Sequence, residues 1–214
     1  ATAGPARLLQ HGAENGRFPV VFIPSLINPP RVLDLSEERS LLRHMAAAGH
    51  DAYLVDWGTP RAEDAMLGLD AHVTDRLLPL LAALPRPPIL VGYCLGGSLA
   101  LGAAALSPIS AVATIAAPWR FSRFPAADLE LIDSLWRGAK AMCARIGYVP
   151  MEVLQSGFWA MDPARTIRKF AAFADAAPES DAERAFLAVE DWANEGAPLT
   201  FAAGRDLFET FYAA

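Results

Sequence analysis

A cysteine stands at the centre of a glycine-rich stretch, "LVGYCLGGSLA", which runs from Leu90 to Ala100. Apolar residues precede the cysteine and small residues follow it, so the pattern predicts a strand, a sharp turn and a helix. Gly92 and Gly96 lie two residues to either side of Cys94, and glycines at these positions leave room for a turn that exposes a nucleophile at the edge of a sheet. We therefore expect Cys94 to be a nucleophile, with sulfur in the place that serine takes in the G-x-S-x-G elbow.

A nucleophile of this kind needs hydrogen-bond donors for the oxyanion that forms during acyl transfer. The backbone N–H of Leu95, at the start of the following helix, is one candidate. We place the second donor near Ser25 and Leu26, in the loop after the first apolar strand, and we assign Gly97 to the same tight turn. The alternative is a structural cysteine in a buried turn, because free cysteine often acts as a small apolar residue.

The general base is harder to find in the sequence. All histidines precede the candidate nucleophile: His11, His44, His50 and His72. In the elbow fold the chain order is nucleophile, acid, histidine, so no histidine stands where the base is expected. Either the chain is a fragment whose base follows residue 214, or the protein lacks the usual triad.

Apolar runs and helical patterns alternate through residues 1–118. We expect strands at 19–26, 51–57, 88–91 and 109–117. We expect helices at 36–49, with Ser36 as N-cap and Gly49 as stop, at 63–84 and at 96–106. This alternation predicts an α/β core with a mostly parallel sheet and helices on both faces. Residues 119–214 are aromatic-rich, contain no β-branched run, and predict a mostly helical cap.

Composition limits the function further. The chain is 53% apolar and 20% charged, which is typical of a globular protein, and its net charge is −6. No basic cluster indicates binding to nucleic acid. The two cysteines, Cys94 and Cys143, do not suffice for a disulfide framework or a four-cysteine zinc site, so we expect a reduced, cytoplasmic setting and neither a metal nor a resident cofactor. Glycines and Pro108 break the uncharged stretch between Arg86 and Arg120, so we expect no membrane span.

The stretch "GYCLGG" resembles the G-x-C-x-G-G box of the polyhydroxyalkanoate synthases, which are enzymes of the α/β-hydrolase fold. Three further segments resemble the family in the same order along the chain. They are "VFIPSLINPPRVLDLSEERSLLRHMAAAGHDAYLVDWGTP" (21–60), "GFWAMDPARTIRKFAAF" (157–173) and "VEDWANEGAPLTFAAGRDLFETFY" (189–212). The resemblance covers nearly the whole chain and implies an α/β-hydrolase core with a helical cap and with its C-terminal strands absent from this chain.

The resemblance also implies an activity. Members of the family transfer 3-hydroxyacyl groups from coenzyme A thioesters onto a cysteine and then onto a growing polyester. The box cysteine matches Cys94, and the oxyanion donors match Leu95 and the loop at Ser25 and Leu26. Coenzyme A thioester is then a substrate, and a homodimer through the cap and a polyester granule are the implied partners. The catalytic Asp and His of the family follow the cap and have no counterpart in residues 1–214.

Two other functions stay open. Arg120 stands where the synthases carry an Asp before Phe-Ser, which favours a thioesterase, an esterase or a small-molecule acyltransferase on the same scaffold. The absence of a histidine after Cys94 favours a synthase-like binding protein without catalysis. Several aromatic residues would line an acyl channel or, alternatively, pack as the core of the cap: Phe121, Phe124, Trp136, Phe158 and Trp159.

Overall fold

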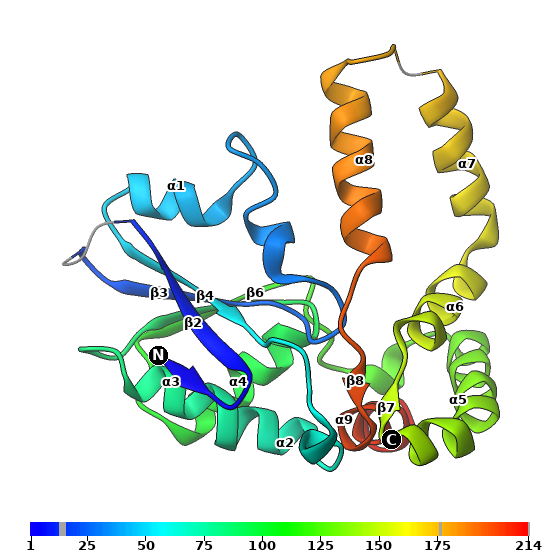
Figure 1. Ribbon diagram of the computed structural model, residues 1–214, viewed down its shortest axis with the longest axis horizontal. Helices are drawn as coiled ribbons and strands as arrows, with labels where there is room; N and C mark the ends of the chain where they lie inside the picture. The colour runs from blue at the N-terminus through cyan, green and yellow to red at the C-terminus, as the bar shows by residue number, and fades with distance from the viewer. Residues whose placement is uncertain (13–15, 176, 214) are drawn as a thin grey trace.

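The computed structural model describes residues 1–12, 16–175 and 177–213, and its centre is a six-stranded sheet (Figure 1). The strand order is β1-β2-β4-β3-β5-β6. The strands are β1 (Thr2–Ala3), β2 (Ala6–His11), β3 (Pro19–Ile23), β4 (Asp51–Asp56), β5 (Ile89–Tyr93) and β6 (Ala111–Ile115). Strands β4, β3, β5 and β6 pair in parallel, whereas β1 and β2 are antiparallel. The prediction of a mostly parallel sheet is therefore confirmed.

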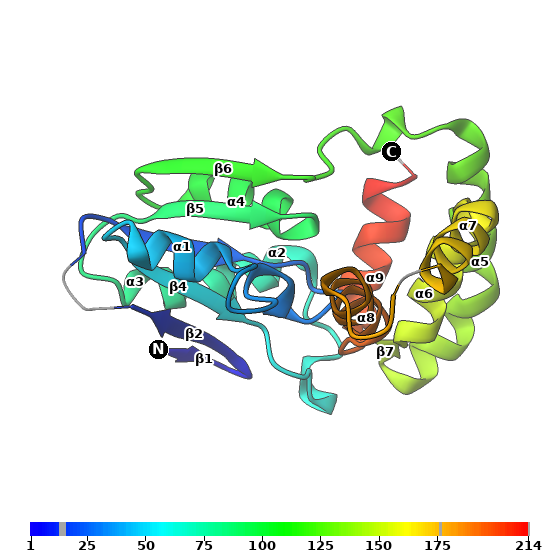
Figure 2. The same ribbon diagram turned by 90° about the horizontal axis from the view of Figure 1, so that it is seen from above.

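Helices cover both faces of this sheet, as Figure 2 shows from above. Helix α1 (Leu41–Ala47) lies on one face, and α2 (Leu69–Ala71), α3 (Leu78–Ala82) and α4 (Leu95–Leu106) lie on the other. All five residues of β3 are buried because both of its faces are covered. Val20 and Phe22 pack into a core beneath α1, whereas Val21 and Ile23 point to the larger core on the opposite face.

The N-terminal residues form two strands that we did not predict. Residues 1–12 lack the β-branched alternation that marks a strand. Pairing with β4 orders this segment, with Leu8 opposite Val55 and an ion pair of 2.5 Å between Arg7 and Asp56. Tertiary pairing overrides weak local propensity here.

Two helix predictions need correction. The first helix begins at Leu41 rather than near Ser36, because turn hydrogen bonds between Ser36 and Arg39 use the preceding residues and the Ser40 hydroxyl caps the helix at Arg43. The expected helix 63–84 is divided into a 3₁₀ turn at Ala62–Asp64, α2, a π-helical segment at His72–Leu77 and α3. Pro79 lies in the first turn of α3, where its missing N–H is tolerated.

After β6 the chain is mostly helical, as expected. A short 3₁₀ helix at Pro30–Leu33 precedes α1 in the core, and another at Phe121–Arg123 opens this second part. Its helices are α5 (Ala126–Ile146), α6 (Met151–Met161), α7 (Pro163–Ala174), α8 (Asp181–Asn194) and α9 (Phe201–Arg205), followed by a π-helical segment at Asp206–Phe211. We did not predict the small antiparallel pair of β7 (Tyr148–Val149) and β8 (Leu199–Thr200). The division into domains at residues 118 and 119 stays a prediction.

Helices α7 and α8 form an arm that projects from the rest of the molecule (Figure 1). Neither helix has a fully buried residue. Phe170 and Phe173 of α7 pack on Phe186 of α8, with ring centroids 5.5 and 4.2 Å apart. Ile167 is 72% exposed, so apolar surface remains on the outside of the arm.

Strand β6 lies at the open edge of the sheet. Among the described residues no strand pairs with its outer edge, and four of its five residues are exposed. It carries no charge or proline, the devices that usually protect an edge strand. This edge can therefore accept a further strand.

Candidate active site

Cys94 occupies the sharp turn between β5 and α4. Its backbone has φ 52° and ψ −130°, a positive φ that is uncommon for a residue with a side chain. Its N–H donates to the Ile115 carbonyl of β6 at 2.9 Å, and α4 begins at the next residue, Leu95. The strand, turn and helix predicted around Cys94 are confirmed, and the thiol is partly exposed.

The glycines around Cys94 are required by close backbone contacts. A Cβ on Gly92 would lie 2.4 Å from the Gly97 Cα atom. A Cβ on Gly96 would lie 2.2 Å from the Ile23 carbonyl oxygen, at the end of β3. The turn thus packs directly against the start of the loop that contains Ser25 and Leu26.

This loop, residues 24–31, follows β3, and its first part, residues 24–27, is buried beside the turn. The exposed fractions of Ser25 and Leu26 are 4% and 8%. The Ser25 hydroxyl accepts from the Ile27 N–H at 3.2 Å, and the Pro24 carbonyl accepts from the Trp57 indole at 3.1 Å. Both N–H groups that we expect to bind an oxyanion, those of Leu26 and Leu95, lack a protein acceptor in the described part of the chain.

Two tyrosines that sequence reasoning missed lie near Cys94. Burial, and then the negative charge of a Cys94 thiolate, raise the pKa of both Tyr93 and Tyr212. Their phenols therefore stay protonated and able to donate hydrogen bonds at neutral pH. Tyr212 also packs against Phe121 and Phe124, with ring centroids 5.0 and 5.3 Å apart. Tyr93 directly precedes the candidate nucleophile, and both tyrosines lie in segments that resemble the synthases, but no spacing in the sequence places Tyr212 near Cys94.

An apolar cavity of about 60 Å³ extends from this region into the cap. Ile27 of the loop and Tyr212 line it together with side chains of α5 and α6, including Trp136 and Phe158. The other candidate aromatic residues have different surroundings: Phe121 is in the core and Trp159 is 53% exposed. Trp136 also packs on Phe208, 4.8 Å between centroids, so it serves both as cap core and as cavity wall.

The histidines lie in other surroundings. His11 pairs with Asp34 at 3.8 Å, His50 stacks on Phe18 and His44 is exposed. Among the described residues no histidine or carboxylate hydrogen bonds to the Cys94 sulfur, and no group of three His, Cys, Asp or Glu side chains could hold a metal ion. Cys143 is buried in α5, and burial raises the pKa of its thiol.

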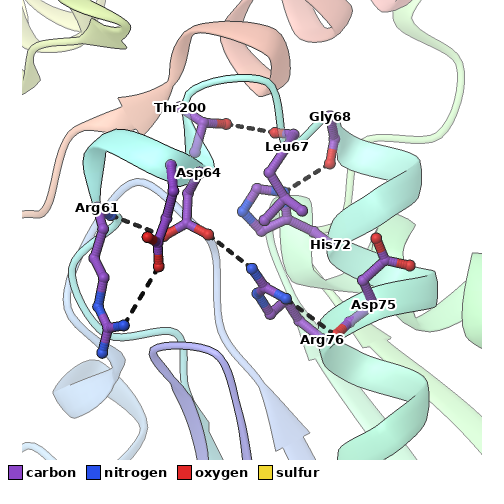
Figure 3. A network of polar contacts seen from close by, with 9 residues as sticks. Arg61, Asp64, Leu67, Gly68, His72, Asp75, Arg76 and Thr200 are labelled. Carbon is purple, nitrogen blue, oxygen red and sulfur yellow. Dashed lines mark hydrogen bonds and ion pairs between the residues drawn. The ribbon is translucent and has the colours of Figure 1, made fainter.

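His72 belongs to a buried polar network at the junction of core and cap (Figure 3). Its Nδ1 lies 2.7 Å from the Gly68 carbonyl oxygen, and so carries the proton of the neutral ring. Asp64, which is 5% exposed, accepts from Arg76 at 2.7 Å and from the Arg61 N–H at 2.8 Å. Thr200 of the cap donates to the Leu67 carbonyl at 2.6 Å, which attaches this network to β8.

The protonation of His72 makes stability depend on pH. Burial, supported by the charge of Arg76, lowers the pKa of His72 below its ordinary value, although the Gly68 hydrogen bond and two carboxylates act in the opposite direction. Below about pH 6.5 the unfolded state therefore binds a proton more readily than the folded state. We expect the free energy of unfolding, measured with urea, to decrease as the pH falls through this value.

A matched pair of variants isolates this contribution. His72→Asn retains a donor near the Gly68 carbonyl but does not titrate, so its free energy of unfolding should decrease less between pH 7 and 5. In His44→Asn, at an exposed position, the free energy of unfolding should change with pH as it does in the wild type. Equal slopes for the wild type and His72→Asn would show that His72 titrates alike in the folded and unfolded states.

Comparison with known proteins identifies the family. A model described as the alpha/beta hydrolase family matches residues 20–214. The chain belongs to this family. Two solved structures share its fold. The first is a carboxylesterase of Nitrososphaera gargenis, with a TM-score of 0.55, 14% identity and coverage of 97% of this chain and 68% of that chain. The other is an AqdC variant that cleaves the ring of the Pseudomonas quinolone signal, with a TM-score of 0.57, 17% identity and the same coverage.

Within the alpha/beta hydrolases this chain is polyhydroxyalkanoate-synthase-like. It is 29% identical over 208 residues to the poly(3-hydroxyalkanoate) polymerase subunit PhaC of Haloarcula marismortui, covering 93% of this chain and 44% of that protein. The PhaC subunit of Haloferax mediterranei is 31% identical over 204 residues, covering 91% and 41%, respectively. That of Allochromatium vinosum is 27% identical over 205 residues, covering 91% and 56%. The chain spans about half the length of these relatives.

Proposed function

We propose that Cys94 is the nucleophile of an acyltransferase that polymerises 3-hydroxyacyl groups from coenzyme A thioesters into a polyhydroxyalkanoate. The observation that carries this proposal is the position of Cys94, held at positive φ between β5 and α4 in a chain similar to PhaC polymerase subunits. The N–H groups of Leu95 and Leu26, which have no protein acceptor among the described residues, support the proposal as candidate oxyanion donors.

The proposed acylation is a thioester exchange. The Cys94 sulfur attacks the carbonyl carbon of the substrate, the carbon–sulfur bond to coenzyme A breaks, and coenzyme A leaves as a thiol after taking up a proton. A hydroxyl group of the next monomer or chain then attacks the acyl-cysteine, and the thiol of Cys94 is restored. We propose that the base and acid for these steps come from residues outside 1–214, because no histidine bonds to Cys94 in the described part.

The apolar cavity beside Ile27 and Tyr212 supports a short acyl side chain. A site for one water-sized group needs about 10–15 Å³, so 60 Å³ holds roughly four such groups. The cavity has no charged lining residue, as expected for an alkyl group. We propose that it receives the side chain of the 3-hydroxyacyl substrate.

We further propose a cytoplasmic protein that forms a homodimer through its cap and associates with the polyester granule. The exposed apolar surface of the α7–α8 arm supports the cap contact. None of the described helices is both long and apolar enough to cross a membrane. Sedimentation velocity at several protein concentrations tests the dimer.

The second candidate is a thioesterase or esterase, which Arg120 favours. This residue is exposed just before the 3₁₀ helix at Phe121, where the synthases carry an Asp. A product assay with 3-hydroxybutyryl-coenzyme A separates the two functions. We expect insoluble polyester together with free coenzyme A. Free 3-hydroxybutyrate without polymer would instead support the hydrolase.

A further inference from the structure

The C-terminal end of α8 forms hydrogen bonds with the loop that follows β3. We call residues 192–196 the α8 clasp. The Trp192 indole donates to the Pro29 carbonyl at 2.8 Å. In return, the Asn28 side chain donates to the carbonyls of Ala193 and Glu195, at 3.2 and 3.3 Å. Three hydrogen bonds thus join segments that lie more than 160 residues apart in the chain.

Steric contact strengthens this connection. A Cβ added to Gly196 would lie 2.3 Å from the Ile27 carbonyl oxygen, so the clasp backbone rests directly on the loop. An ion pair between Arg31 and Glu195 closes the outer side. The Trp192 ring also lies 6.4 Å from the ring of Tyr93, the residue before Cys94. The clasp therefore contacts the loop and also the residue that precedes the nucleophile.

The first half of the loop has restraints of its own: the Trp57 indole donates to the Pro24 carbonyl, the Ser25 hydroxyl accepts from the Ile27 N–H, and Leu26 and Ile27 are buried. The second half, from Asn28 to Arg31, is only partly buried. Pro29 and Pro30 have no N–H to donate. The half of the loop that contains them therefore depends on hydrogen bonds from residues of other segments. The clasp supplies these hydrogen bonds from the cap, immediately after the position of Leu26.

We infer that the α8 clasp fixes the position of the Leu26 N–H, and that Asn28 and Trp192 are positioning residues for acyl transfer. This inference rests on the proposed function, because Leu26 is an oxyanion donor only if Cys94 is acylated. It couples the cap arm to the chemistry, since a displacement of α8 moves the loop. A shift of about 1 Å in such a group can cost 10²-fold in rate.

Two variants of the natural full-length polypeptide test the clasp. Gly196→Ala places a methyl group against Ile27, and Trp192→Phe retains a ring but removes the donor to Pro29. In both we expect single-turnover acylation by 3-hydroxybutyryl-coenzyme A to slow by about 10- to 100-fold. Alkylation of Cys94 by iodoacetamide should keep its wild-type rate. The sulfur displaces iodide from the methylene carbon of the reagent, and this substitution forms no oxyanion.

A matched control and a second measurement distinguish the outcomes. Gly138→Ala, whose Cβ meets no atom within 4 Å, should be acylated at the wild-type rate. Hydrogen exchange of residues 25–28 should be faster in Gly196→Ala than in the wild type. Unchanged exchange would overturn the clasp whatever the chemistry. Wild-type acylation in both variants, or an equal loss of acylation and alkylation, would overturn its positioning role. Absence of acylation in the wild type itself would overturn the proposed function. In that case only the hydrogen exchange of residues 25–28 would test whether the clasp holds the loop.

Discussion

Replacing Cys94 by alanine is expected to abolish acyl transfer, with a loss of at least about 10⁴-fold in kcat, as for other nucleophiles of triad enzymes. The loss follows from chemistry, because no atom of alanine can form the thioester intermediate. The folded structure should survive, since the side chain is partly exposed and its sulfur bonds to no histidine or carboxylate in the described residues. Release of coenzyme A, followed with a thiol reagent after removal of the enzyme, measures this loss.

Cys143→Ala is the matched control. This second thiol is buried in α5, and burial raises its pKa, so it does not act as a nucleophile. We expect Cys143→Ala to keep its activity, with at most a modest loss of stability from the small cavity. Activity retained in Cys94→Ala would contradict the assignment of the nucleophile.

Removing the Asp64 carboxylate is expected to cost about 3 kcal/mol of stability, because it leaves the guanidinium of the partly buried Arg76 without its counter-charge. Burial alone raises the pKa of Asp64, but its bonds to Arg61 and Arg76 outweigh burial and hold the pKa below its ordinary value. The carboxylate is therefore charged at neutral pH. Its contribution is present above about pH 4 and is lost as the pH falls through the lowered pKa. Urea unfolding of Asp64→Ala at pH 7 measures the loss.

Two further variants identify the cause. Glu63→Ala removes a neighbouring carboxylate that is exposed and only loosely paired with Arg61, so it should change stability by less than about 0.5 kcal/mol. Asp64→Leu combined with Arg76→Met replaces the pair by apolar groups and should recover much of the loss. If Asp64→Ala proves as mild as Glu63→Ala, the pair does not hold the junction of core and cap.

The buried strands were predictable because their residues carry the signal locally. Pro19–Ile23 is a continuous apolar run, and only a strand covered on both faces buries all of it. Residues 1–12 carry no such signal, since their strands depend on pairing with β4. The same holds for β7 and β8, in which two residues pair with two others some fifty positions away.

The candidate site likewise has one part that the sequence predicts and another that only tertiary packing brings together. The spacing of Gly92, Cys94 and Gly96 predicts the turn, because the close contacts involve backbone atoms near in sequence or on the adjacent strand. Tyr212 and Trp192 could not be assigned by spacing, since tertiary packing of the cap brings them to the site. Asn28 occurs in the segment that resembles the synthases, but only the structure shows its contact with α8.

The central claim is that Cys94 forms the acyl-enzyme. Intact mass of the natural full-length polypeptide, before and after brief incubation with 3-hydroxybutyryl-coenzyme A, tests it most directly. We predict a hydroxybutyryl adduct that maps to the peptide containing Cys94 and disappears in Cys94→Ala. No adduct, or an adduct that persists in Cys94→Ala, would contradict the claim.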